Sequence, residues 1–184
     1  MSKPETVDPA PPDGDGGTES LGRFAPPAGD SRMVDVHLLR LPLRLMRASR
    51  EHHDGLMREL RLLALSGQVG EQDLPVRLVE LVRILGERYG TNRDQGDEDI
   101  QAAVAAGRDT LDRVQVVPAA SAEAARQLGA LVAEADEYCE QSLLMTLPRH
   151  PVLRRFGDWY LGEFVSQVSG SPAVAWDGPL RLED

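Results

Sequence analysis

The chain has 184 residues, a formal net charge of -10 and a single cysteine, Cys139. An acidic balance of this size repels nucleic acid and anionic membrane surfaces, so neither is expected as a main partner. One cysteine excludes an internal disulfide and a cysteine metal cluster.

The composition along the chain predicts one folded domain between two tails. Residues 1–32 are rich in Pro, Gly and Asp and lack the apolar content that would offset the entropy of ordering, so a disordered tail is expected there. Residues 33–170 hold the periodic segments of the domain. Residues 171–184 lose periodicity and form either a loose tail or an extended arm with Trp176 docked on the body. No signal peptide or membrane-span pattern is present, and a cytoplasmic location is expected.

The first half of the domain begins with an alternating segment. Val34, Val36 and Leu38 alternate with polar residues, which predicts a short strand. Pro42 suits a first helical turn, and a helix is expected from there to about residue 65. Two further helices are predicted over residues 73–90 and from residue 91 to just before residue 107.

The second half has a similar order of elements. Val114 and Val116 predict a second short strand, which Pro118 ends. A helix is expected over residues 120–141, and a last one from near Pro148 or Pro151 to residue 168. The whole pattern predicts a mainly α domain of about five helices with two short strands.

The two halves also resemble each other in pattern. Each reads as a strand, a proline, a long helix, a Leu-Pro pair and another helix, and the two copies are about 75 residues apart. A βαα pseudo-repeat is therefore one interpretation, with coincidence as the other. In a true repeat the two halves would pack about a pseudo-twofold axis and their strands would pair with each other.

The segment "REHHDGL", residues 50–56, places two histidines on the first long helix. His53 falls on the apolar stripe of the helix, and His52 lies at the edge of that stripe. Adjacent histidines point about 100° apart, so they cannot chelate one ion from a single helix, and the i, i+4 spacing of zincins is absent. No metal site and no cofactor are expected. The plain interpretation is a core or interface histidine, which can also make packing pH-sensitive.

The same segment resembles the H-box of sensor histidine kinases, whose motif reads Arg-Glu-Leu-His-Asp-Gly. The resemblance implies that His53 accepts a phosphoryl group and that Asp54 orients its ring and takes up its proton. His52 departs from the motif, which has leucine there. No glycine-rich phosphate loop follows and too few residues remain for an ATP-binding domain, so such a protein would need another kinase.

Residues of the last helix and of the segment before it are the candidate partner-binding set. Trp159 lies next to the predicted core row of aromatic residues and can serve as an exposed anchor. Arg149, Arg154 and Arg155 form the one dense basic patch of an acidic chain. These arginines are either solvated, or take an acidic partner, or pair with the acidic helix of a second copy in a homodimer.

The folded part as a whole resembles a group of small actinobacterial helical proteins. The resemblance rests on residues 33–65, on "LGALVAEADEYC" and on "WYLGEFVSQ". Genes of that group accompany partner-switching components, namely anti-sigma-factor kinases, their antagonists and serine phosphatases. The expected function is therefore a non-catalytic regulatory or scaffold protein that binds a protein partner in bacterial signal transduction. The alternative is a histidine phosphotransfer protein. No Ser-His-Asp arrangement or nucleotide loop is present, and an enzyme is not expected.

Overall fold

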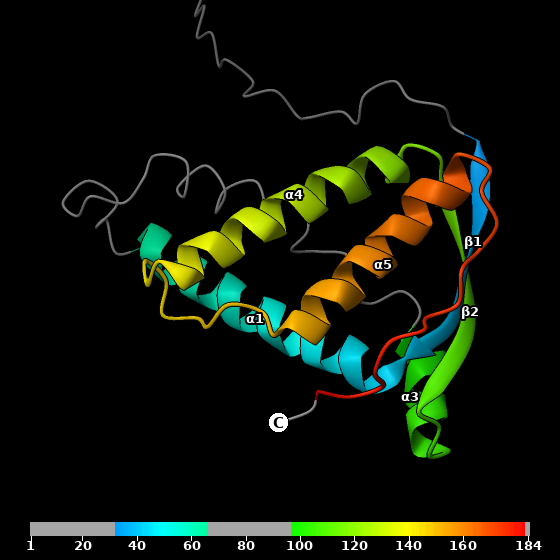
Figure 1. The fold of residues 1–184 in the computed structure, drawn as a ribbon, viewed down its shortest axis with the longest axis horizontal. Coiled ribbons are helices and arrows are strands. Elements are labelled where there is room, and N and C mark those ends of the chain that lie inside the picture. Colours follow the sequence, from blue (N-terminus) through cyan, green and yellow to red (C-terminus); the bar gives the residue numbers. More distant parts are fainter. Residues whose placement is uncertain (1–31, 66–96, 183–184) are drawn as a thin grey trace, which may run out of the picture.

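The structure, a computed structural model, describes residues 32–65 and 97–182. The elements in chain order are β1 (Met33–Pro42), α1 (Leu43–Leu65), α3 (Asp97–Ala105), β2 (Thr110–Pro118), α4 (Ser121–Glu140) and α5 (Pro151–Val168) (Figure 1). The helix predicted over 73–90 and nearly all of the tail predicted over 1–32 lie outside the described residues. Within those two described ranges, none of the helices is long and apolar enough to cross a bilayer.

The two strands form one antiparallel ribbon. The pairing runs from Met33 opposite Pro118 to Pro42 opposite Thr110, with an irregularity between Leu38 and Leu41. Arg40 lies inside that irregularity with a φ of 55°, in the left-handed region that non-glycine residues seldom adopt. Its amide N–H donates to Oδ1 of Asp112 at 2.7 Å, so a side chain of the partner strand satisfies the backbone at the bulge.

The predicted fold class is wrong in its balance of elements. About 57% of the confidently placed residues are helical and about 16% lie in strands, with four helices and a two-stranded sheet, so the fold is mixed α/β and not mainly α with about five helices. The strands are 10 and 9 residues long, not short. The alternating apolar residues mark only the first part of β1 and the middle of β2. Cross-strand pairing extends both strands over residues without a strand pattern of their own.

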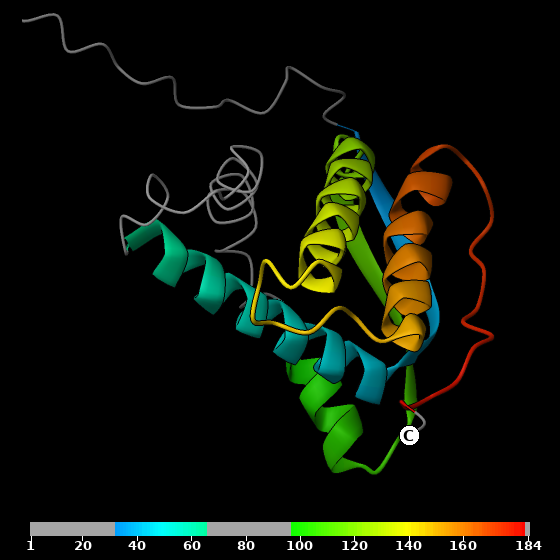
Figure 2. The same cartoon turned by 60° about the vertical axis from the view of Figure 1, so that its left-hand side comes forward.

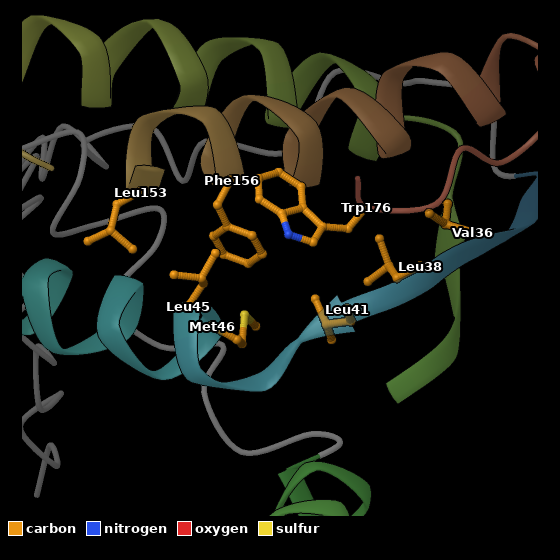
Figure 3. Close-up of a cluster of buried hydrophobic side chains, with 8 residues drawn as sticks. All are labelled: Val36, Leu38, Leu41, Leu45, Met46, Leu153, Phe156 and Trp176. Atoms are coloured by element: carbon orange, nitrogen blue, oxygen red, sulfur yellow. The ribbon is translucent and has the colours of Figure 1, made fainter. Parts of the chain in front are cut away.

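The helices cover one face of the ribbon. α5 packs on β1, α4 packs on α5, and α1 crosses below and contacts α5 (Figure 2). Side chains from β1, α1, α5 and the chain end meet in a central apolar cluster (Figure 3). Its buried members are Val36, Leu38, Leu41, Leu45, Met46, Leu153, Phe156 and Trp176. The ribbon thus supplies one wall of the core, which makes it a layer of the domain.

The segment after α5 is an extended arm docked on the body. Trp176 is only 1% exposed, and its ring meets that of Phe156 edge to face at 5.9 Å. The amide N–H of Trp176 donates to the carbonyl oxygen of Leu39 at 3.0 Å, so the arm also bonds to the backbone of β1. Of the two forms considered for this segment, the structure has the docked arm.

A second apolar cluster lies at the other end of α1. α1 and α4 contribute its buried residues together with one residue from the segment that follows α4. These are Leu56, Met57, Leu60, Leu131, Ala135, Cys139 and Leu144. α1 therefore carries side chains into both clusters, because Leu45 and Met46 belong to the central one.

Candidate functional site

Residues 141–150 connect α4 to α5 and run alongside α1 without regular structure (Figures 1 and 2). This α4–α5 linker turns at Ser142, which has a φ of 58°. Leu144 then enters the second apolar cluster, next to residues of α1. The linker is therefore part of the packed structure.

Glu59 of α1 holds the middle of the linker. Its carboxylate accepts hydrogen bonds from the amide N–H of Met145, from the amide N–H of Thr146 at 2.7 Å and from the hydroxyl of Thr146 at 2.5 Å. Hydrogen bonds to an ionised acceptor are stronger than neutral ones, and three of them converge on one side chain. This carboxylate fixes the backbone of two consecutive linker residues.

Asp136 of α4 holds the end of the linker. The carboxylate is buried and accepts from the amide N–H of Arg149 at 3.0 Å and from Nε of the same residue at 2.9 Å. The Arg149 side chain is 11% exposed and lies against Gly157 of α5, where an added Cβ would approach its guanidinium to 2.9 Å. Burial of both partners makes this ion pair a structural one, because neither charge could stay buried alone.

A second arginine completes this buried polar group. Nε of Arg154 lies 3.2 Å from Oδ2 of Asp136, and its guanidinium also donates to Glu140. The hydrogen bond to Glu140 is the main cause that raises the pKa of Arg154. α4 is therefore joined to the linker and to the first turn of α5 through two acidic side chains.

Two titratable side chains border this group. Burial lowers the pKa of His52, against a smaller opposite effect of Asp136. Burial, with the Asp136 and Glu59 carboxylates adding to it, raises the pKa of the Cys139 thiol to about 11. A thiol with that pKa stays protonated near neutral pH and is a poor nucleophile. Within residues 32–65 and 97–182, no group of three or more His, Cys, Asp or Glu side chains is placed to hold a metal ion.

The linker backbone, held by the Glu59 and Asp136 carboxylates, presents apolar side chains to solvent. Met145 is 93% exposed and Leu147 is 79% exposed, while Leu144, just before them, is buried. Leu62 of α1 is also exposed, and it lies one helical turn beyond Glu59 on the same face. Large apolar side chains at this exposure, on a backbone fixed by hydrogen bonds, are typical of a protein-binding surface.

The histidine pair lies on α1 and is not part of this exposed apolar surface. Met46, Met57 and Leu60 of the apolar stripe are buried, but His53 is only half-buried. Asp54 beside it is half-buried too, and both side chains have interaction partners. His53 is thus neither fully exposed, as a phosphoacceptor would be, nor sealed in the core, and the phosphoacceptor role stays a prediction.

The predicted partner-binding residues are used inside the molecule. Arg149 and Arg154 pair with α4, and Arg155 donates to Asp177 of the arm at 2.7 Å while lying 5.5 Å from the Trp176 ring centre. Trp159 is half-buried and donates its indole N–H to the carbonyl oxygen of Val174 at 2.9 Å. The arm and α4 therefore supply partners for this set, and Arg155 stays 56% exposed, so its use in partner binding stays a prediction.

Sequence reasoning missed the linker residues. The run "SLLMTLP" holds three leucines and a methionine between two helices, although connecting segments are usually polar. That excess of apolar residues outside any periodic segment was the available signal. The Glu59 clamp left no signal, because it joins residues 86 and 87 positions apart.

Comparisons with models of protein families, with curated proteins and with solved structures find no match for this chain.

Proposed function

We propose that this chain is a non-catalytic regulatory or scaffold protein that binds a protein partner through its α4–α5 linker. Met145 and Leu147 are the anchors, and Leu62 extends the apolar surface. The observation that carries the proposal is the exposure of both anchors on a backbone that Glu59 holds by three hydrogen bonds. The partner offers an apolar pocket that takes these side chains.

The fixed backbone supports binding for an energetic reason. Ordering a loop on association costs free energy, and a loop that is already ordered avoids most of that cost. Methionine adds adaptability, because its unbranched thioether fits pockets of different shape. Exposed leucine and methionine side chains are otherwise unfavourable in water, and burying them against a partner is favourable.

The setting of the proposal comes from the resemblance noted in the sequence. Small helical proteins of that group are encoded near partner-switching components, and the partner we propose is one of these, in the cytoplasm. The acidic charge of -10 fits a protein partner better than nucleic acid.

The test uses the full chain with Met145→Asp and Leu147→Asp together. Proteins captured from the native cells by wild type are identified, and each candidate is then purified and titrated against both forms. The double variant should bind at least about thirtyfold more weakly, as expected for loss of hot-spot residues. Circular dichroism should show an unchanged fold, since both positions are exposed.

Two further variants sharpen the result. Val104→Asp changes an exposed apolar residue of α3 and should leave binding unchanged. Glu59→Ala removes the clamp but keeps both anchors, and it should weaken binding by releasing the linker. Equal binding by wild type and by the double aspartate variant would disprove the proposal.

A further inference from the structure

The two edges of the β ribbon differ in how far other parts of the chain cover them. On the outer edge of β1, the amide N–H of His37 donates to Oε1 of Gln167, and Nε2 of Gln167 donates to the carbonyl oxygen of His37, both at 2.9 Å. Further along the same edge, Leu39 accepts from the amide N–H of Trp176. α5 and the arm therefore cover the β1 edge.

The register shows which backbone groups line the other edge. His37 is opposite Val114, and because both polar backbone groups of His37 bond to Gln167, this pair is of the non-hydrogen-bonded kind. In such a pair the backbone groups of both residues point away from the partner strand. Hydrogen-bonded and non-hydrogen-bonded pairs alternate along the ribbon, so Asp35 and Val116, two residues further on, are also a non-hydrogen-bonded pair. The N–H and C=O groups of Val114 and Val116 consequently line the outer edge of β2.

The described residues leave this β2 edge without a backbone partner. No backbone hydrogen bond between residues of the described ranges reaches the outward groups of Val114 or Val116. The side chains at the same positions are 52% and 61% exposed on the outer face of the ribbon, opposite His37 and Asp35 of β1. An open strand edge with exposed valine side chains is a template for another strand.

Between Arg113 and Pro118, the edge also lacks the features that normally block strand pairing. Residues 114–117 read "VQVV", without charge, proline or bulge. The nearest acidic side chain on β2 itself, Asp112, is turned toward β1, where it accepts from the Arg40 amide. Asp112 is thus hydrogen-bonded within the ribbon.

From these features we infer that β2 pairs with β2 of a second copy of this chain, so that two ribbons join into one antiparallel sheet about a twofold axis. A second copy fits because antiparallel strands related by a twofold axis are self-complementary. With the axis at Gln115, Val114 of each chain lies opposite Val116 of the other, and each such pair exchanges two backbone hydrogen bonds. The four exposed valines then form one apolar centre on the outer face.

Other registers are less favourable for stated reasons. An axis at Arg113 sets the two arginines against each other, and like charges directly opposite destabilise a sheet. An axis at Val116 sets Val114 opposite Pro118, which has no N–H to donate. An axis at Val114 sets Asp112 against a valine. The register centred on Gln115 alone pairs valine with valine at both positions.

The oligomeric state of the full chain tests the inference. Sedimentation equilibrium at up to about 100 µM chain should give a dimer, in a concentration-dependent way. Val116→Lys should raise the dissociation constant at least about tenfold, because it sets a charge within the apolar centre. Val104→Lys, an equally exposed site on α3, should have no effect. Circular dichroism of each variant confirms its fold.

Salt separates this contact from association through opposite charges. Each chain carries a net charge of -10, so two copies repel each other, and screening should tighten the dimer between about 50 and 500 mM NaCl. Dimers held by the arginine patch and the acidic helix would instead weaken as salt rises, and that result would overturn the inference.

A cross-linking experiment tests the register. An equimolar mixture of Val114→Cys and Val116→Cys chains should be joined by a short bismaleimide faster than either variant alone. Cys139 is buried with a raised thiol pKa and should stay unlabelled at neutral pH. A chain that is monomeric under all these conditions, or that dimerises equally well with Val116→Lys, overturns the inference. The inference is also overturned if wild type is monomeric and Val116→Lys instead abolishes binding to a different protein, because the β2 edge would then serve that protein. The linker and the ribbon lie at different ends of the molecule (Figure 1), so either proposal can fail without the other.

Discussion

At the scale of single residues, the most consequential side chain is the buried Asp136. It accepts from the backbone and side chain of Arg149 and lies 3.2 Å from Arg154. A buried carboxylate is tolerated only when it is paired and hydrogen-bonded, and here a linker residue and a helix residue supply the pairing. His52 and Cys139 border this group, and burial is the main cause that favours the uncharged form of each.

The lowered pKa of His52 predicts a pH dependence of stability. The unfolded chain has the ordinary pKa of 6.5 and the folded chain a lower one, so the unfolded state binds more protons as the pH falls below 6.5. The stability contribution is full above pH 6.5 and is lost as the pH falls through the interval between the two values. Urea unfolding at pH 7.5 and 5.5 should therefore show a smaller loss for His52→Gln than for wild type. His37→Gln, at an exposed position, is the control and should behave as wild type does. An equal loss for His52→Gln would contradict the argument.

At the scale of elements, the arm after α5 closes the central cluster. Trp176 places its ring against Phe156 and Trp159 and donates its indole N–H to Pro179 at 2.9 Å. The ring folds closely over Gly178, where an added Cβ would lie 2.3 Å from it. Glu163 of α5 accepts from the amide N–H of Val174, so the arm is held by backbone bonds as well as by packing. These contacts make the arm an integral element of the fold.

Removing the Trp176 side chain should therefore destabilise the whole domain. Trp176→Ala creates a large cavity in the central cluster, and the free energy of unfolding should fall by about 3–5 kcal/mol. Urea denaturation followed by far-UV circular dichroism measures the change. Val174→Ala, at an exposed position of the same arm, is the matched control and should lose less than about 1 kcal/mol. A small effect of Trp176→Ala would show that the arm is dispensable.

At the scale of the whole molecule, α1 links the central and the second apolar clusters, and its Leu43 packs with Ile100 and Ala103 of α3 in a smaller third one. Its first turns contribute Leu45 and Met46 to the central cluster, and its later turns contribute Leu56, Met57 and Leu60 to the second. α5 adds a second connection, because its start is tied to α4 through Arg154 while its body packs on β1. Shared helices of this kind favour cooperative unfolding of the two clusters.

A core substitution in the second cluster tests this coupling. Leu60→Ala should lower the free energy of unfolding by about 2–5 kcal/mol. Both tryptophans contact the central cluster, so tryptophan fluorescence reports on the far end of the molecule. Fluorescence and far-UV circular dichroism should give the same shifted midpoint. A fluorescence midpoint that stays at the wild-type value would show that the clusters unfold separately.

The helices of the second half could be read from the sequence to within a residue or so. The structure has α4 at Ser121–Glu140 and α5 at Pro151–Val168, against predictions of 120–141 and a start near residue 148 or 151. Apolar periodicity and Pro151 carry this information locally. The third helix is seen over Asp97–Ala105, and its predicted start at residue 91 lies outside the described residues. The strands are longer than predicted, because their ends depend on pairing with distant residues.

In the candidate site, too, the sequence indicated residue types but not their contacts or exposure. The identity of each side chain marked the histidine pair, Trp159 and the arginines as candidates, because residue type and helical spacing are local properties. Whether an arginine is free depends on what lies opposite, and Asp136, Glu140 and Asp177 come from other parts of the chain. The exposed anchors Met145 and Leu147 likewise depend on Glu59, far away in the sequence.

The sequence by itself determined that this protein has amphipathic helices, two strand-forming segments and an acidic surface, because these follow from residue type and spacing. Only the tertiary structure decided that the ribbon forms a wall of the core, that the arginines pair with acidic side chains of the same chain and that Met145, Leu147 and the β2 edge face outward. The physical reason is that exposure and ion pairing are properties of two surfaces brought together, and the sequence records each surface separately.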